Sequence, residues 1–209
     1  MSKAASLYER PLRESVRGDV ARLVRGTASY RGPLSPVRVA AAFVSNRGLQ
    51  ALLLYRLSHA LWRRGVPGLP MLLSRVAQIV FAVDIDYKAQ LGPGISLVHC
   101  FGIVIGGNAR LEGDSSLFHG VTLGDRGSEW VGSSRPDGHP TLERGLIVGA
   151  GAKILGPIRV GHHSVIGANS VVMDDVPPCS VVAGIPGRVV SRNKSAVCHE
   201  CQEKEQDAA

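Results

Sequence analysis

Two histidines hold the same place in a regular repeat of this 209-residue sequence. His99 is third in Leu97-Val98-His99, and His119 is third in Leu117-Phe118-His119. An imidazole, with an unperturbed pKa of about 6.5, exchanges protons readily near neutral pH. A carboxylate beside it fixes its tautomer, as in a general base that deprotonates a hydroxyl. We therefore predict that His99 is a general base with Asp84 as its partner; the alternative is a surface histidine stacked on its neighbour.

The histidines lie within a six-residue repeat over residues 84–190. The repeated aliphatic positions form three series: Ile85, Leu91, Leu97, Ile103; then Ile105, Leu111, Leu117, Leu123; then Leu142, Val148, Ile154, Val160, Ile166, Val172. A six-residue period fits neither an α-helix nor an alternating strand, and it is typical of a hexapeptide β-helix. The first and fifth positions of each hexad face inward. His99 and His119 should therefore face outward on successive coils, about 4.8 Å apart.

The repeat is interrupted twice. It slips by two residues between Ile103 and Ile105, and it is lost between Leu123 and Leu142. The second interruption is a polar excursion that contains several charged residues and a third histidine: Arg126, Glu129, Arg135, Asp137 and His139. Long excursions from a regular scaffold usually carry function. The excursion is therefore a second source of site residues.

The sequence before the repeat predicts helices. Leu12, Val16, Val20 and Leu23 recur at helical spacing, residues 26–36 read as a break, and residues 47–64 and 69–82 favour two further helices. The predicted fold is mainly β, a parallel β-helix preceded by an α-helical region. We divide the chain into a helical region (1–82), a β-helix (83–192) with a loop at 124–141, and a flexible tail (193–209).

The formal net charge of +7 suits a negatively charged partner. Nucleic acid, anionic lipid and a phosphorylated small molecule are all candidates. The sequence has no nucleic-acid motif and no basic stripe interleaved with aromatic residues, which favours the small molecule. Residues 69–83, the most apolar run, are too few to span a bilayer. We expect no nucleic-acid partner and no membrane partner.

The sequence predicts a reduced, cytoplasmic protein. The first twenty residues lack the apolar core of a secretory signal. The four cysteines show no disulfide framework. The Cys198-His199-Glu200-Cys201 segment has no second cysteine pair that would complete a zinc site. Three or four converging ligands are needed for zinc, and the adjacent His162 and His163 should point apart. We therefore expect no metal.

Several motifs resemble those of serine acetyltransferases, over residues 47–192. They are Val83-Asp84-Ile85, Leu97-Val98-His99, Gly102-Ile103-Val104-Ile105-Gly106, His119-Gly120-Val121-Thr122-Leu123-Gly124, Asp137-Gly138-His139-Pro140, Gly149-Ala150-Gly151-Ala152-Lys153-Ile154-Leu155-Gly156 and Gly184-Ile185-Pro186-Gly187-Arg188. The resemblance implies a left-handed β-helix and a homotrimer that binds acetyl-CoA between subunits. Whether two trimers pair into a hexamer remains open.

The resemblance also assigns roles. His99 matches the catalytic base, Asp84 its carboxylate partner, and His139 a second active-site histidine contributed across the subunit boundary. Small residues match the wall along the pantetheine arm of CoA, and two cations are candidates for its phosphates. This cofactor set is Gly124, Gly149, Ala150, Gly151, Ala152, Lys153, Gly167, Ala168 and Arg188.

The acceptor side departs from the family. Val98 stands where the family has an Asp that contacts the amino acid, and Gly138 where it has a carboxylate-binding Arg. Arg126 or Arg135 from the longer loop could take over that contact, so the expected acceptor-binding residues are Val98, Asp137, Arg126 and Arg135.

The predicted function is acetyl-CoA-dependent O-acetylation of an amino acid or an amino-acid-like acceptor. The alternative is an authentic L-serine O-acetyltransferase of cysteine biosynthesis. A third reading, a non-catalytic or metal-binding scaffold, is disfavoured by the joint presence of Asp84, His99 and His139. The sequence ends in Ala209 rather than the Ile by which the family docks on cysteine synthase, so that complex is not expected.

Overall fold

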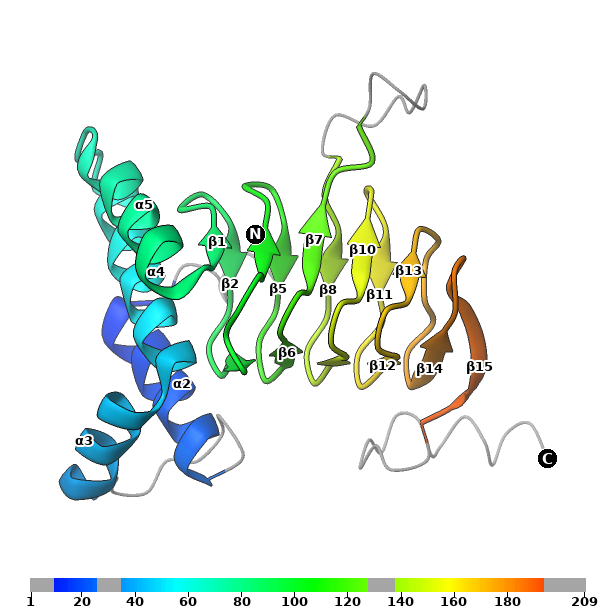
Figure 1. Ribbon diagram of the computed structural model, residues 1–209, viewed down its shortest axis with the longest axis horizontal. Helices are drawn as coiled ribbons and strands as arrows, with labels where there is room; N and C mark the ends of the chain where they lie inside the picture. The colour runs from blue at the N-terminus through cyan, green and yellow to red at the C-terminus, as the bar shows by residue number, and fades with distance from the viewer. Residues whose placement is uncertain (1–9, 26–34, 128–137, 194–209) are drawn as a thin grey trace.

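The helices of the described residues, α2 to α5, cover one end of a β-helix (Figure 1). The structure, a computed structural model, describes residues 10–25, 35–127 and 138–193. The helices are α2 (Leu12–Arg25), α3 (Pro36–Ser45), α4 (Arg47–Arg63) and α5 (Leu69–Phe81). Within these ranges, no helix combines the length and the apolar character that crossing a bilayer requires. The sequence predicted α2, α4 and α5 but gave no signal for α3.

The strands form three parallel sheets, which we name faces A, B and C. Face A contains β1 (Asp84–Ile85), β4 (Val104–Ile105), β7 (Thr122–Gly124), β10 (Lys153–Leu155) and β13 (Val171–Val172). Face B contains β2 (Gln90–Leu91), β5 (Arg110–Leu111), β8 (Thr141–Leu142) and β11 (Arg159–Val160). Face C contains β3 (Ser96–Val98), β6 (Ser116–Phe118), β9 (Ile147–Val148), β12 (Val165–Ile166), β14 (Ser180–Ala183) and β15 (Arg188–Arg192).

This arrangement confirms the predicted parallel β-helix with an N-terminal helical region. Neighbouring strands within each face are parallel, except that β15 closes face C by pairing antiparallel with β14. The hexad residues point inward: in β4, for example, Val104 is exposed while Ile105 is 1% exposed. Each coil buries its inner face only against the coils beside it, as expected of a solenoid.

The polar excursion leaves the stack undisturbed. It begins after β7 and returns at β8. β7 pairs with β4 and β10, while β8 pairs with β5 and β11, all in parallel register. The coil that carries the excursion therefore keeps the same pairing as its neighbours.

The helical region is attached to the first coil through a buried ion pair. Arg56 of α4 donates to both carboxylate oxygens of Asp19 in α2, at 3.0 and 3.2 Å, and also to the carbonyls of Leu91 and Gly92. The Asp19 carboxylate in turn accepts the N–H groups of Gly94 and Ile95 at 2.9 and 3.0 Å. Because every charged group here is hydrogen-bonded, the pair can be buried without an unsatisfied charge.

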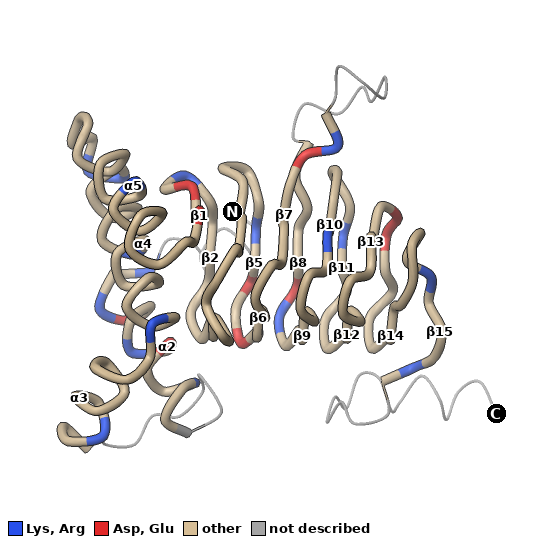
Figure 2. The backbone as a smooth tube through the Cα atoms, in the orientation of Figure 1, with Lys and Arg blue, Asp and Glu red and all other residues tan. Residues whose placement is uncertain are grey.

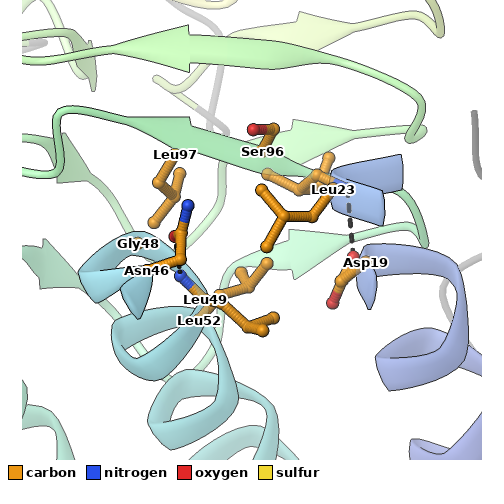
Figure 3. Close-up of a pocket in the computed structure, with 9 residues that line it drawn as sticks. Asp19, Leu23, Asn46, Gly48, Leu49, Leu52, Ser96 and Leu97 are labelled. Atoms are coloured by element: carbon orange, nitrogen blue, oxygen red, sulfur yellow. Dashed lines mark hydrogen bonds between the residues drawn. The ribbon is translucent and has the colours of Figure 1, made fainter. Parts of the chain in front are cut away.

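Small side chains and a helix cap complete the attachment. Figure 3 shows Asp19 and Leu23 of α2 beside Gly48, Leu49 and Leu52 of α4, all facing Ser96 and Leu97 of β3. A Cβ added to Gly48 would lie 2.1 Å from the carbonyl oxygen of Leu97, so only glycine allows this approach. Asn46 caps α4 by accepting the N–H of Leu49 at 2.8 Å.

One expectation about the cysteines is wrong. Cys179, in the turn before β14, is disulfide-bonded, and its partner lies outside the described residues. The cysteine spacing alone gave no disulfide framework because the bond joins residues whose proximity depends on the fold.

Candidate active site

The two repeat histidines lie on one edge of the β-helix. We name the turns that lead from face C to face A the C–A edge; they comprise residues 99–103, 119–121, 149–152 and 167–170. Successive turns are joined by backbone hydrogen bonds of 2.8 Å: Gly120 to Phe101, Gly151 to His119, and Asn169 to Ala150. The edge is therefore a continuous ladder on which side chains from successive coils stand next to one another.

His99 and His119 meet on this edge as the repeat predicted. Their ring centroids are 6.2 Å apart, with the rings at 67° in an edge-to-face arrangement. Both side chains are exposed. His99 has a backbone φ of 52°, in the left-handed region that residues other than glycine seldom adopt. Such strained positions cluster at functional sites because the surrounding structure must hold them in place.

The neighbouring cysteine does not compete with the imidazole for the chemistry. Cys100 is a free, buried thiol. Burial raises the pKa of Cys100 to about 11, although the positive charge of Arg47 opposes the shift. The thiol therefore stays protonated at neutral pH and is a poor nucleophile. Among the groups of this turn, the His99 ring is the one suited to proton transfer.

Asp84 lies beside the His99 turn but is not bonded to the imidazole. Its side chain projects outward from β1, and its N–H donates to the carbonyl of Ile103 at 2.9 Å. Across the described parts of the chain, no hydrogen bond or ion pair joins the Asp84 carboxylate to the His99 ring. The pairing of Asp84 with His99 therefore stays a prediction.

Beyond His119 the C–A edge carries only small side chains. The positions are Gly149, Ala150, Gly151 and Ala152 on one coil and Gly167, Ala168 and Asn169 on the next. A Cβ on Gly151 would lie 2.1 Å from the Asn169 side-chain oxygen, and one on Gly149 would lie 2.6 Å from the Ala168 nitrogen. Close stacking of the turns alone thus requires glycine at these two positions, and it also leaves a strip without bulky groups.

His139 lies on a different edge. It follows the excursion and packs on Gly106, in the turn from face A to face B, where an added Cβ would lie 2.2 Å from its Nε2. Its Nδ1 is buried and has no hydrogen-bond partner among the described residues. Face A separates this turn from the C–A edge. One chain does not bring His99 and His139 together.

Comparison with known proteins identifies the family of this chain. The chain is 40% identical over 180 residues to the serine acetyltransferase of Mycobacterium tuberculosis, which covers 86% of this chain and 74% of the relative. The chain belongs to the serine acetyltransferase family. These are acyltransferases, and the predicted family is thereby confirmed. No family model matches the sequence.

Other family members extend the comparison. The Haemophilus influenzae serine acetyltransferase is 43% identical over 150 residues, but the chain spans only about half of that relative, 54% of its length. A solved serine acetyltransferase in complex with cysteine superposes with a TM-score of 0.75 at 36% identity, covering 88% of this chain and 68% of that one. Another, in complex with CoA, has a TM-score of 0.68 at 34% identity, covering 85% and 68%.

The side chains next to His99 are largely apolar. Val98 projects outward from β3 and is in register with Phe118 of β6, next to His119. Phe101, two residues after His99, is 68% exposed. As the fifth residue of the hexad that begins at Leu97, Phe101 was expected to face inward, and this expectation is wrong. Phe118 was given no role, although the hexad register alone aligns it with Val98.

The glycine at position 138 has a structural reason. A Cβ there would lie 2.3 Å from the Asp125 carboxylate carbon, so a larger residue would displace Asp125. Asp125 also accepts the N–H of Gly127 at 3.1 Å. Gly138 and Asp125 thus lie close together, one at each end of the excursion. Asp137 and Arg135, two of the expected acceptor-binding residues, lie outside the described residues.

Arg126 is directed away from His139. Its stem packs on Gly156, and its Nη2 donates to the carbonyl of Met173. Its Nε is buried without a hydrogen-bond partner in the described part of the chain. Since Gly156 and Met173 belong to the fourth and fifth coils and Gly106 to the second, the expected role of Arg126 in binding the acceptor needs a contact that this chain alone does not make.

The expected cofactor residues divide between edges. Gly124 ends β7, opposite Leu155, and so lies at the far end of face A from the C–A edge. The Lys153 ammonium bends back along the C–A edge, donating to the Gly120 carbonyl at 2.6 Å and to Thr122 Oγ1 at 3.0 Å. Arg188 forms an exposed ion pair with Asp174 at 2.9 Å, a contact of small energetic weight.

Within the part of the chain that the structure describes, the histidines form no group that could hold a metal ion. In residues 10–25, 35–127 and 138–193, no three His, Cys, Asp or Glu side chains are grouped so that they could hold an ion. His162 and His163 do not point apart as expected: their ring centroids are 5.4 Å apart, edge to face at 83°.

Proposed function

We propose that this protein transfers the acetyl group of acetyl-CoA to a hydroxyl of an amino acid or an amino-acid-like acceptor, with His99 as the general base. The observation that carries the proposal is the exposed His99 imidazole on the C–A edge of a serine acetyltransferase family member, beside a strip free of bulky side chains. Gly149, Ala150, Gly151, Ala152, Gly167 and Ala168 leave room along this strip for a narrow pantetheine arm.

The reaction needs one base and one anion-stabilising site. His99 takes the proton of the acceptor hydroxyl while the oxygen attacks the thioester carbonyl carbon. N–H groups of the backbone stabilise the resulting oxyanion. When the C–S bond breaks, the imidazolium returns its proton to the departing thiolate, so that an acetyl ester and the free thiol of CoA are formed. Asp84 stabilises the imidazolium from β1.

His139 joins the site from a neighbouring subunit in this proposal. It lies on a different edge from His99 within one chain, and its buried Nδ1 lacks a partner there. A homotrimer in which the two edges face one another brings the histidines together. Acetyl-CoA and the acceptor then bind at the boundary between subunits, and Lys153 and Arg188 contribute positive charge toward the phosphates.

The acceptor has two candidates. An amino-acid-like hydroxyl compound suits Val98, Phe118 and Phe101, which surround His99 with apolar surface. L-serine is favoured by the relatives, which are named serine acetyltransferases at 40–44% identity. Activity on L-serine would require a carboxylate contact from the excursion or from the neighbouring subunit.

The first test is release of free thiol from acetyl-CoA with L-serine and with a panel of other hydroxyl compounds. His99→Gln should lower turnover by about 10²–10⁴-fold, the usual contribution of a general base. His119→Gln is the matched control, since it removes an exposed imidazole from the same position one coil later, and it should retain most activity. Full activity of His99→Gln would overturn the assigned base. If calorimetry detects no binding of acetyl-CoA, the proposal that the protein is an acetyl-CoA-dependent enzyme is wrong.

A mixing experiment tests the shared site. His99→Ala and His139→Ala are refolded together in equal amounts. About a quarter of the subunit boundaries in random trimers then contain both intact histidines, so about a quarter of wild-type activity should return. Activity that stays at the level of the separate variants would exclude a site built from two chains.

A further inference from the structure

The chain around His99 carries no formal charge. Residues 89–109 and 115–124, which include His99 and His119, contain no Lys, Arg, Asp or Glu. Figure 2 accordingly shows neither blue nor red on β3, on β6 and on the turns that follow them. A hydroxyl that gives its proton to His99 must come within hydrogen-bonding distance of the ring. The groups next to that hydroxyl therefore meet a neutral surface on this chain.

This neutral surface is made of hydrocarbon side chains. Val98 precedes His99 and projects outward from β3, and Phe118 of β6 is in register with it. Paired strands lie about 4.8 Å apart, so the two side chains adjoin. Phe101 belongs to the same turn as His99 and is 68% exposed. We name Val98, Phe101 and Phe118 the acceptor patch, since they flank the base along the chain and on the next coil.

Two cations approach this region from other elements. Lys153 donates to the Gly120 carbonyl at 2.6 Å, and the positive charge of Arg47 acts on the Cys100 thiol. The hydrogen bonds of both cations go to neutral oxygens, which leave their charge in place. A positive charge on the acceptor would be repelled by them. The Asp84 carboxylate already has a role in the proposed function, as the partner of the imidazolium.

We propose that the acceptor patch selects a hydroxyl compound that carries an apolar group, rather than an ammonium, on the carbon next to its hydroxyl-bearing carbon. This inference rests on the proposed function, because His99 must be the base for these residues to meet the acceptor. An ammonium that leaves water for a hydrocarbon surface loses hydration and gains no counter-charge. A methyl or a larger alkyl group gains contact with Val98 and Phe118 instead.

The proposed homotrimer covers the acceptor patch. The C–A edge then faces a neighbouring subunit, so the exposure of Phe101 in one chain is not exposure in the assembly. The acceptor binds at the same boundary, and its hydroxyl must reach His99. Val98 lies directly beside this base, and substitutions of Val98 are therefore the most direct test of selection.

The test compares hydroxyl compounds of one shape, arranged as two pairs. L-serine is paired with 3-hydroxy-2-methylpropanoate, in which a methyl group replaces the ammonium. In the same way, 2-aminopropan-1-ol is paired with 2-methylpropan-1-ol. Thiol release from acetyl-CoA gives kcat/KM for each compound. In both pairs we expect kcat/KM of the methyl compound to be higher by about tenfold or more, the discrimination that one small group produces in an apolar pocket.

Variants of Val98 assign the selection to the acceptor patch. Val98→Asp supplies a carboxylate beside the base and should shift the ratio within each pair about tenfold toward the ammonium compound. Val98→Asn is the matched control, because it has the shape of Asp without the charge, and it should shift the ratio less. Val190→Asp adds the same charge to β15, where Val190 is 61% exposed, and should leave both ratios unchanged. A ratio within one variant cancels any general effect on catalysis.

Several results would overturn the inference. Acetylation of neither methyl compound would do so, as would an equal or higher kcat/KM for the ammonium compound in either pair. An unchanged ratio in Val98→Asp would also overturn it, and dissociation of the oligomer in sedimentation velocity would then assign Val98 to the contact between subunits.

Calorimetry with acetyl-CoA separates this inference from the proposed function. If acetyl-CoA binds and L-serine is acetylated in a His99-dependent reaction while the methyl compounds are not, the proposed function stands and the inference is wrong. If acetyl-CoA does not bind and no compound is acetylated, both are wrong.

Discussion

The β-helix and the helical region differ in how far they expose their aliphatic residues to solvent. In the β-helix, Ile105 is 1% exposed and its neighbours in the hexad series are likewise buried. In the helical region, Ile79 is 84% exposed on a helix of similar apolar character. The β-helix assigns the repeated aliphatic position of every hexad to the interior, because each coil repeats the last. A helix that packs on the β-helix buries only one of its sides, and this packing does not determine whether residues on the other side are exposed or buried.

A buried ion pair between Asp19 and Arg56 helps to join the two regions. We expect the largest loss of stability when this pair is broken. Asp19→Ala leaves the Arg56 guanidinium buried without a counter-charge, and it should lower the free energy of unfolding by about 3–5 kcal/mol. Urea denaturation followed by circular dichroism measures the loss.

The control for this change is the partly exposed pair of Arg22 and Asp114, 3.5 Å apart. Arg22→Gln should cost at most about 1 kcal/mol. If Asp19→Ala costs no more than Arg22→Gln, the buried pair does not hold the helical region on the first coil. Asp19→Leu combined with Arg56→Met should recover much of the lost stability, since it removes both charges together.

A second prediction tests this difference in exposure directly. Ile105→Ala opens a cavity in the β-helix and should lower the free energy of unfolding by about 2–5 kcal/mol. Ile79→Ala removes the same atoms from an exposed position and should change it by less than about 0.5 kcal/mol. Equal losses in urea titrations of the two variants would mean that Ile79 is covered in solution.

A third, smaller effect concerns pH. His59 of α4 lies 2.8 Å from the Tyr87 carbonyl of the first coil and contacts Tyr55 and Trp62. Burial lowers the pKa of His59, although the Tyr87 carbonyl opposes the shift. The unfolded chain therefore takes up a proton near pH 6.5 that the folded chain resists. Stability contributed by neutral His59 is present above this pH and declines as the pH falls below it.

His59→Gln should weaken this dependence. Urea midpoints of the wild type should fall between pH 7.5 and 5.5 by more than those of the variant. Between pH 7.5 and 8.5 the two proteins should respond alike. An identical acid response in both would show that His59 does not contribute to the coupling between α4 and the first coil.

The sequence predicted most where it repeats. The hexad period alone predicted that the repeated aliphatic residues face inward, that His99 and His119 face outward, and that the two histidines meet across one coil. It wrongly placed Phe101 in the interior. It gave no information on contacts that occur once. Asp19 and Arg56 are 37 positions apart in segments without a shared pattern, and their pairing depends on how two helices meet the open end of the β-helix.

The candidate site follows the same rule. The C–A edge could be assembled from the repeat, including the small residues beyond His119. The direction of Lys153 could not, because a long side chain chooses among several hydrogen-bond acceptors that only the folded edge presents. The exposure of Leu72 and Ile79 on α5 could not be predicted either, since an amphipathic pattern does not tell which apolar residues pack on the β-helix. The relation of Asp84 to His99 stays a prediction.

The excursion after β7 separates the stability of the stacked coils from the sequence of the loop that leaves them. Gly124 and Thr141 stay paired with their neighbours, so the stack is complete whatever lies between them. The entropy of closing a loop grows only slowly with its length, and a longer or shorter insertion changes stability little. Substitutions can therefore accumulate in the loop before His139 while the hexad residues of the core stay the same. Under the proposed function, the acceptor could change in this way during evolution without loss of the fold.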